Sequence, residues 1–253
     1  MGIQVIPLVL CRTLARRNIN GKRSYVKVSS SLFTQLRLFD SIKNKQKNTC
    51  SGEESEKPVT VHLASGQTLK GTAGCTTPLS IAQRVRVKGA LVTKVNGELW
   101  DLGRPIQTDC ELQFLDFETP EGRQAAWRTG ACVLSGVLQS VLGAQVYREG
   151  ASEFGLYCDH HLKDGPLSLS NVEERCLMAA AQKFPITRLE LKMEEVQDLF
   201  QNNDLRLWLI EEQLTGPFVS VYRCGDSIGV CDGPLLPHTG YLKIFRMLQV
   251  SMQ

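Results

Sequence analysis

Acidic residues are missing from the first 39 positions of the sequence, although seven Lys and Arg side chains lie there among Ser and apolar residues. This composition is typical of an organelle transit peptide. We therefore predict a mitochondrial transit peptide over residues 1–40 and a location in the mitochondrial matrix. A disordered basic tail is the alternative interpretation. The polar, charged segment 41–57 that follows is predicted to be a linker.

Long hydrophobic runs are also absent. The apolar stretch Ile3–Leu10 is too short to cross a bilayer, so no membrane contact is expected. Beyond residue 39 the chain has 22 Lys and Arg side chains against 26 Asp and Glu. Nucleic-acid affinity that depends on neutralising many phosphates requires a basic surface. Any contact with RNA is therefore expected to be local.

Metal-binding patterns of cysteine and histidine are absent as well. The nine cysteines include no Cys-x-x-Cys pair, and the four histidines lack zinc-finger spacing. Neither a disulfide framework nor a structural zinc site is indicated. No metal and no cofactor are predicted, and most of the cysteines are expected to be buried apolar side chains.

The segment that follows the predicted linker has the pattern of a small α+β domain. Apolar and polar residues alternate on both sides of Ser65-Gly66, which predicts a hairpin. Thr77 is a suitable helix N-cap, with Pro78 at the first helical position. Asn96-Gly97 favours a type I′ turn between a second pair of strands. Two hairpins around one helix predict a β-grasp-like domain over residues 58–119.

A second α+β domain is predicted over residues 120–253. Its first helix is expected to begin near Gln124 and to end at Gly143. A strand pair and a second helix follow, the helix capped by Ser170 or Asn171. A third helix and a return to strand alternation complete the predicted domain.

The residues of both domains resemble a known family. TTPLSIAQRV and KVNGELWDLGRPIQTDCELQFLDF resemble the TGS domain of threonyl-tRNA synthetases, particularly the mitochondrial enzyme. AAWRTGACVLSGVLQSVLGAQV, EFGLYCDHHL and VCDGPLLPHTG resemble the editing domain that follows it. The resemblance extends over residues 59–240. It implies a β-grasp (TGS-like) domain followed by an editing-like α+β domain.

The resemblance also implies which residues occupy the editing site. In that family, histidines of an HxxxH helix motif and a Cys-x-Gly-Pro-His turn position the water and the terminal adenosine ester, so that a mischarged seryl group is hydrolysed from the tRNA. The positions that match the family's site residues are Arg128, Cys132, Cys231 and Leu235. Arginine stays protonated and only donates hydrogen bonds, and the apolar side chain of leucine can neither exchange a proton nor form a hydrogen bond. We therefore expect a relic site without catalytic residues.

The relic positions allow two further interpretations. Cys132 could be a thiol activated by the neighbouring Arg128, although a buried structural cysteine is the more common case. Cys231 could also take part in a remodelled metal site, although the spacings are not diagnostic. Its partners would be Cys158, His160, His161 and His238. The tryptophans Trp100, Trp127 and Trp208 are expected to be core residues rather than base-stacking platforms.

Three functions are considered on the basis of the resemblance. Trp127-Arg128, Gly225-Asp226 and the segment GPLLP are similar to a mitochondrial large-subunit ribosomal protein family of threonyl-tRNA synthetase descent. This similarity predicts a non-catalytic structural component of the mitochondrial large ribosomal subunit. Its partners would be ribosomal proteins, rRNA and possibly tRNA, with no small-molecule substrate and no aminoacylation core.

The alternative is a truncated mitochondrial synthetase paralogue or isoform that acts as a tRNA-binding or editing-like module. A free-standing editing hydrolase with altered residues is a third interpretation.

Overall fold

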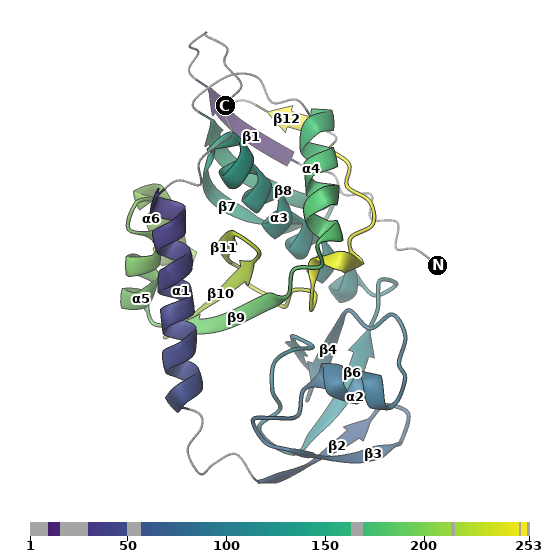
Figure 1. Ribbon diagram of the computed structural model, residues 1–253. Helices are drawn as coiled ribbons and strands as arrows, with labels where there is room; N and C mark the ends of the chain where they lie inside the picture. Colours follow the sequence, from purple (N-terminus) through teal and green to yellow (C-terminus); the bar gives the residue numbers. More distant parts are fainter. Residues whose placement is uncertain are drawn as a thin grey trace. The chain divides into compact units, whose positions relative to one another are not determined.

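The computed structural model describes residues 10–15, 30–49, 57–162, 169–213, 216–247 and 249–251. Strands and helices alternate along them in an α+β arrangement, as predicted (Figure 1). The chain divides into two compact units. The small unit comprises residues 40–126 and 233–237, and the large unit comprises residues 1–39, 127–232 and 238–253. None of the helices in the described ranges is long and apolar enough to span a membrane.

The small unit is built on a five-stranded mixed sheet with the strand order β3-β2-β6-β4-β5. Its central strands β2 and β6 are parallel, and β3, β4 and β5 pair antiparallel with their neighbours. The strands are β2 (Pro58–Leu63), β3 (Thr68–Thr72), β4 (Val92–Val95), β5 (Glu98–Trp100) and β6 (Cys110–Leu115). Both predicted hairpins are confirmed. The single helix α2 (Pro78–Arg84) is also the one that the sequence predicts.

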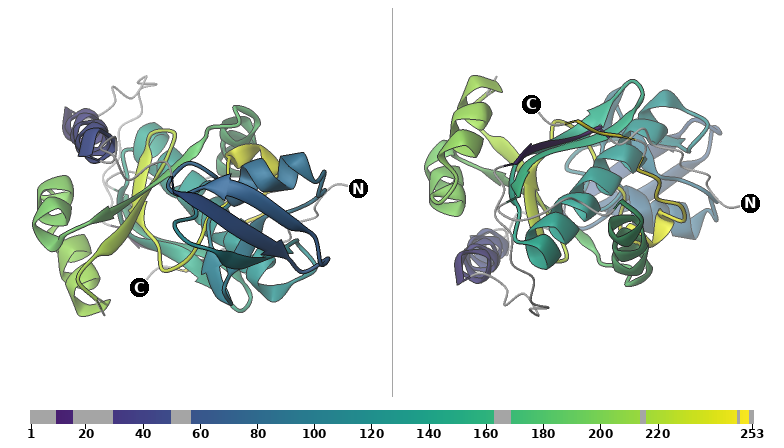
Figure 2. Two further views of the ribbon diagram at one scale, coloured as in Figure 1. Left: turned by 90° about the horizontal axis from the view of Figure 1, so that it is seen from below. Right: turned by 90° about the horizontal axis from the view of Figure 1, so that it is seen from above.

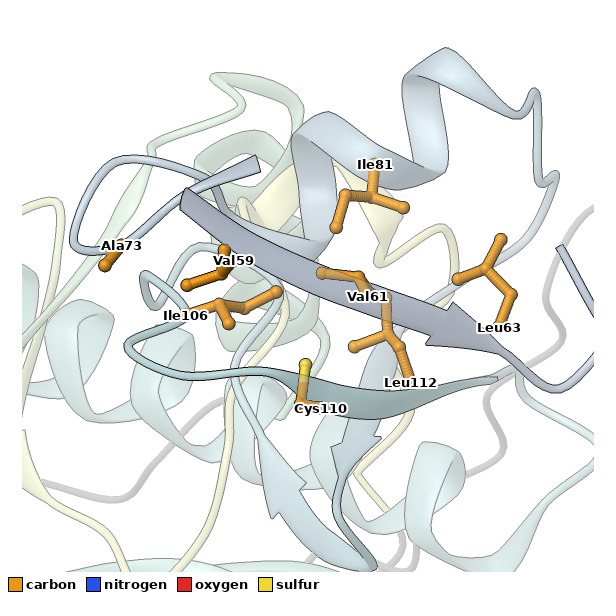
Figure 3. Close-up of a cluster of buried hydrophobic side chains, with 8 residues drawn as sticks. All are labelled: Val59, Val61, Leu63, Ala73, Ile81, Ile106, Cys110 and Leu112. Atoms are coloured by element: carbon orange, nitrogen blue, oxygen red, sulfur yellow. The ribbon is translucent and has the colours of Figure 1, made fainter. Parts of the chain in front are cut away.

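Local side-chain chemistry explains why these elements begin and end where they do. Thr77 caps α2 in a reciprocal capping box with Ser80. Asn96 and Gly97 both have positive φ, at 51° and 86°, as a type I′ turn requires. The buried core lies between α2 and the sheet, where Ile81 of α2 faces Val61 of β2 (Figure 3).

The large unit contains two sheets. In the first sheet the strand order is β12-β1-β8-β7, with β1 parallel to both of its neighbours and β7 antiparallel to β8. These strands are β1 (Leu10–Ala15), β7 (Gln145–Ser152), β8 (Gly155–Leu162) and β12 (Gln249–Ser251). The second sheet is an antiparallel set in the order β11-β10-β9. Its strands are β9 (Ile186–Leu191), β10 (Val219–Cys224) and β11 (Ser227–Val230).

Helices α3 (Pro120–Leu142) and α4 (Leu169–Ala181) lie over the same face of the four-stranded sheet (Figure 1, Figure 2). Glycines let α3 approach its neighbours closely. A Cβ on Gly130 would lie 2.7 Å from Leu156 of β8, and one on Gly136 would lie 3.1 Å from Ser227 of β11. Helices α5 (Met193–Phe200) and α6 (Asp204–Gln213) pack side by side, and α6 also contacts β7 (Figure 2).

The structure corrects several predictions of local structure. Helix α1 (Ser30–Thr49) continues into the segment 41–57 that is predicted to be a linker, because Leu32, Phe39 and Ile42 give it a buried face. Helix α4 already begins at Leu169, so Ser170 and Asn171 are helical and neither is the N-cap. Strand β9 and helix α6 have no counterpart in the sequence prediction. Residues 1–9, 16–29 and 50–56 of the predicted transit peptide and linker lie outside the described residues.

The division between the units also differs from the predicted boundary after residue 119. The units separate after Ala126, six residues beyond the start of α3 at Pro120. The short segment Gly233–Pro237 belongs to the small unit, although it is far along the chain. The predicted domain bounds, residues 58–119 and 120–253, stay a prediction.

Candidate functional site

Arg128 and Cys132 lie one turn apart on α3, as the sequence predicts. Residues with this spacing share one face of a helix. Cys132 is buried, with 4% of its surface exposed, whereas Arg128 is half-buried. The helix therefore places the guanidinium toward a pocket and the thiol within the protein interior.

The environment of Cys132 opposes thiolate chemistry. Its Sγ lies 3.9 Å from the hydroxyl of Ser227 on β11. Hydrogen bonding with the thiol of Cys224, together with burial, raises the pKa of Cys132 well above its usual value. A neutral thiol is a poor nucleophile and a poor base. The interpretation of Cys132 as a thiol activated by Arg128 is therefore wrong.

Cys231 follows directly after β11 and lines a pocket of about 100 Å³ within the large unit. Arg128 of α3 lines the same pocket, so two of the four predicted relic positions meet there. Other lining residues come from β7, β8 and α6, among them Glu149, Tyr157 and Arg206. Burial raises the pKa of the Tyr157 hydroxyl, which therefore remains neutral and able to donate.

Two residues that line this pocket form a buried ion pair that the sequence did not predict. Arg206 of α6 donates to Oε1 of Glu149 on β7 at 2.7 Å, and both side chains are about 95% buried. Burial raises the pKa of the Glu149 carboxyl, and the Arg206 cation opposes that shift. One feature of the sequence was compatible with a buried Arg206. This residue lies four positions before Ile210, and the two side chains share the buried face of α6.

Two charged groups that line the pocket have a buried polar atom without a hydrogen-bond partner among the described residues. These atoms are Nη1 of Arg128, a donor, and Oε2 of Glu149, an acceptor. Buried polar atoms are nearly always hydrogen-bonded, so each exception calls for an explanation. Each of these two residues thus has one buried polar atom whose hydrogen-bonding requirement is not met by the described residues.

The fourth relic position, Leu235, belongs to the small unit. Leu235 is buried in the small unit, and its backbone N–H donates to Oδ1 of Asp101 at 3.0 Å. Its side chain is apolar and cannot exchange protons. Leu235 and the other three positions belong to different units, so their grouping in one relic site stays a prediction.

The histidines and cysteines considered for a remodelled metal site have structural contacts. His160 is buried with Nδ1 3.2 Å from the carbonyl of Cys158, and burial lowers the pKa of its imidazole. His238 accepts a hydrogen bond from the N–H of Gly240 and stacks on Tyr241. Across the described ranges, no cluster of three or more His, Cys, Asp or Glu side chains is arranged to bind a metal ion.

The tryptophans depart from the prediction that all three are core residues. Trp208 on α6 is 53% exposed, so it is not a core residue. Trp100 is half-buried, and the guanidinium of Arg104 lies 3.5 Å from its ring centroid. Trp127 is also half-buried, with its Nε1 buried and without a hydrogen-bond partner among the described residues.

Comparison with known proteins identifies what the chain resembles. It is 38% identical to the mitochondrial threonine–tRNA ligase of Mus musculus over 208 residues, which cover 79% of this chain and 28% of the relative. The human mitochondrial enzyme is 32% identical over 253 residues, which cover 95% of this chain and 35% of the relative. The enzyme of Thermotoga maritima is 36% identical over 199 residues, or 76% of this chain and 31% of the relative. No family model matches the chain.

The chain spans about a third of the length of these relatives. Both mitochondrial and bacterial threonyl-tRNA synthetases match it, so the similarity is not confined to one lineage. The comparisons favour the synthetase-related alternative over the structural ribosomal role that the sequence predicts, and nothing in them supports that role. Over about four-fifths of its length, this chain is homologous to threonyl-tRNA synthetase.

Proposed function

We propose that this chain is a non-hydrolytic, tRNA-binding module related to threonyl-tRNA synthetase and that it acts in the mitochondrial matrix. The similarity to mitochondrial and bacterial synthetases supports a role connected with tRNA. The mitochondrial relatives and the acid-free N-terminal segment support the location. Activity as a hydrolase is not part of the proposal.

The observation that carries the non-hydrolytic part is the chemistry at the relic positions. Hydrolysis of an ester requires a group that moves a proton near neutral pH. The guanidinium of Arg128 has only donors, the raised pKa of Cys132 keeps its thiol neutral, and Leu235 is apolar. None of these three side chains can act as a general base.

A group of basic side chains in the small unit is suited to local phosphate contacts. Arg84, Arg86 and Lys88 lie within five residues at the end of α2, and all three side chains are exposed. Cations in such a turn can contact the phosphates of a tRNA without a basic surface over the whole protein. This arrangement agrees with the net acidic composition beyond residue 39.

Binding of mitochondrial tRNA(Thr) to the full chain tests the proposal, with affinity measured against salt concentration. Lys88→Glu is expected to weaken binding and to make the salt dependence less steep, because one phosphate contact is lost. Lys57→Glu is the matched control, since Lys57 is also an exposed lysine of the small unit. Equal affinities for the two variants would remove the turn from the proposal. A lack of tRNA binding by the unmodified chain would reject tRNA binding altogether.

A deacylation assay and a sedimentation experiment separate the alternatives. The chain is expected to leave seryl-tRNA(Thr) intact, and hydrolysis that Cys231→Ser abolishes would reject the non-hydrolytic assignment. In a gradient of solubilised mitochondria, the protein is expected to remain apart from the large ribosomal subunit. Ribonuclease-sensitive comigration with that subunit would favour the ribosomal role instead.

A further inference from the structure

Helix α6 has apolar side chains on both of its sides. Its inner side packs through Arg206 and Ile210, which are both buried. Its outer side carries Leu205 and Trp208, which are 43% and 53% exposed. A helix on the surface of a globular protein normally has charged or polar residues on its outward side. The exposed parts of these two side chains are therefore not explained by the packing of the large unit.

Carboxylates surround the two exposed apolar side chains. Residues three and four positions apart share one side of a helix, so Asp204, Glu211 and Glu212 lie on the side that carries Trp208. All three are exposed. Glu211 also accepts a hydrogen bond from Nε2 of Gln197 on the adjacent α5, at 3.2 Å. The outer face of α6 is formed by Asp204, Leu205, Trp208, Glu211 and Glu212.

The charge of the helix pair α5 and α6, which lie side by side (Figure 2), restricts what this face can bind. The acidic residues of the segment 193–213 are Glu194, Glu195, Asp198, Asp204, Glu211 and Glu212. Its single basic residue, Arg206, is buried and paired with Glu149. The surface of the segment is therefore negative and repels the phosphates of a nucleic acid. The same face of a second copy of the chain would also bring like charges together.

We propose that the outer face of α6 binds a basic segment of a partner protein. The lysine and arginine side chains of that segment pair with the carboxylates, and an apolar side chain between them packs against Trp208 and Leu205. Tryptophan often dominates the affinity of a protein interface because it buries a large apolar area. Complementary charges around it determine the orientation and the rate of association. The inference goes beyond the proposed function, because the proposed phosphate contacts involve cations of the small unit.

Fluorescence anisotropy of a labelled synthetic peptide tests the inference on the full chain. The probe is a helical peptide of lysine and leucine in which the leucines recur on one side. Trp208→Ala is expected to weaken its binding about tenfold or more, because the central apolar contact is lost. Met178→Ala is the matched control, since Met178 is also an exposed apolar residue of the large unit, on α4. It is expected to leave the affinity unchanged.

A double variant, Glu211→Gln with Glu212→Gln, tests the contribution of charge to the same binding. It is expected to weaken binding of the peptide several-fold at low salt and to make the salt dependence less steep, because two carboxylates of the outer face are lost. Glu98→Gln is the control, since Glu98 is an exposed carboxylate of the small unit.

The results that would overturn the inference also identify other occupants. Equal affinity of the Trp208→Ala protein and the unmodified protein would mean that the peptide binds elsewhere. Equal binding of a peptide with the same composition but dispersed leucines would reject the apolar anchor. Dimerisation that Trp208→Ala abolishes in a sedimentation experiment would assign the face to a second copy, and loss of tRNA binding in that variant would assign it to tRNA. Peptide binding by a chain that does not bind tRNA would reject the proposed function and retain this inference.

Discussion

The replacement Arg206→Leu tests the buried ion pair between Arg206 and Glu149, which both line the pocket. The variant leaves the Glu149 carboxylate without its cation, while both positions remain about 95% buried. Removing one partner of a buried pair typically costs about 3–5 kcal/mol, because the remaining charge is uncompensated. For a chain of this size each kcal/mol lowers the melting temperature by about 2–4 °C, so we expect a decrease of about 6–20 °C.

The pH dependence of this loss has a defined sign. Burial already raises the pKa of Glu149 in the folded protein, and removing the Arg206 cation raises it further. A carboxyl whose folded pKa exceeds its unfolded value contributes stability at low pH, and that stability is lost as the pH rises through the folded pKa. The deficit of Arg206→Leu is therefore expected to be smaller near pH 5 than near pH 8.

Thermal denaturation followed by circular dichroism at the two pH values measures both quantities. Lys94→Met is the matched control, because Lys94 donates to Glu121 at a similar distance, 2.8 Å, but both side chains are about 30% exposed. Exposed pairs contribute about 0–1 kcal/mol, so the control should be nearly neutral. If Arg206→Leu is no less stable than Lys94→Met, or if its deficit does not change with pH, the assignment of a buried charged pair is wrong.

Three further predictions concern single positions. Gly229→Ala should lower the free energy of unfolding by about 1–3 kcal/mol, because the new Cβ would overlap the buried carboxylate of Glu149. Urea titration measures this loss. Gly103→Ala is the control in the same titration, because a Cβ at that position meets open space. Thr77→Ala removes the N-cap of α2 and should cost about 1 kcal/mol in that assay. Maleimide should modify the exposed Cys75 well before the buried Cys132, whose pKa is raised, and mass spectrometry measures the order of labelling. Faster labelling of Cys132 would contradict its assignment as a neutral buried thiol.

Elements with strong local signals were predictable from the sequence. The Asn96-Gly97 pair specifies its turn because both residues tolerate positive φ. Thr77 and the following proline define the start of α2 within a few residues. Gly143, with φ of 63°, ends α3 where the sequence predicts. Each of these signals lies within the segment that it organises.

Features that depend on distant residues were not predictable in this way. Glu149 and Arg206 are 57 positions apart, and only the tertiary fold brings them together. Strand β1 pairs with β8 more than 140 residues later, and a parallel pairing of this kind leaves no local pattern. The helical part of the predicted linker depends on Ile42, which is buried by packing rather than by any signal in the polar sequence around it.

The candidate site also shows how a single sequence can indicate loss of one chemistry without indicating what takes its place. Arg128 identifies a position that cannot act as a base, and that conclusion follows from side-chain chemistry alone. That its Nη1 is buried without a hydrogen-bond partner among the described residues follows only from the structure.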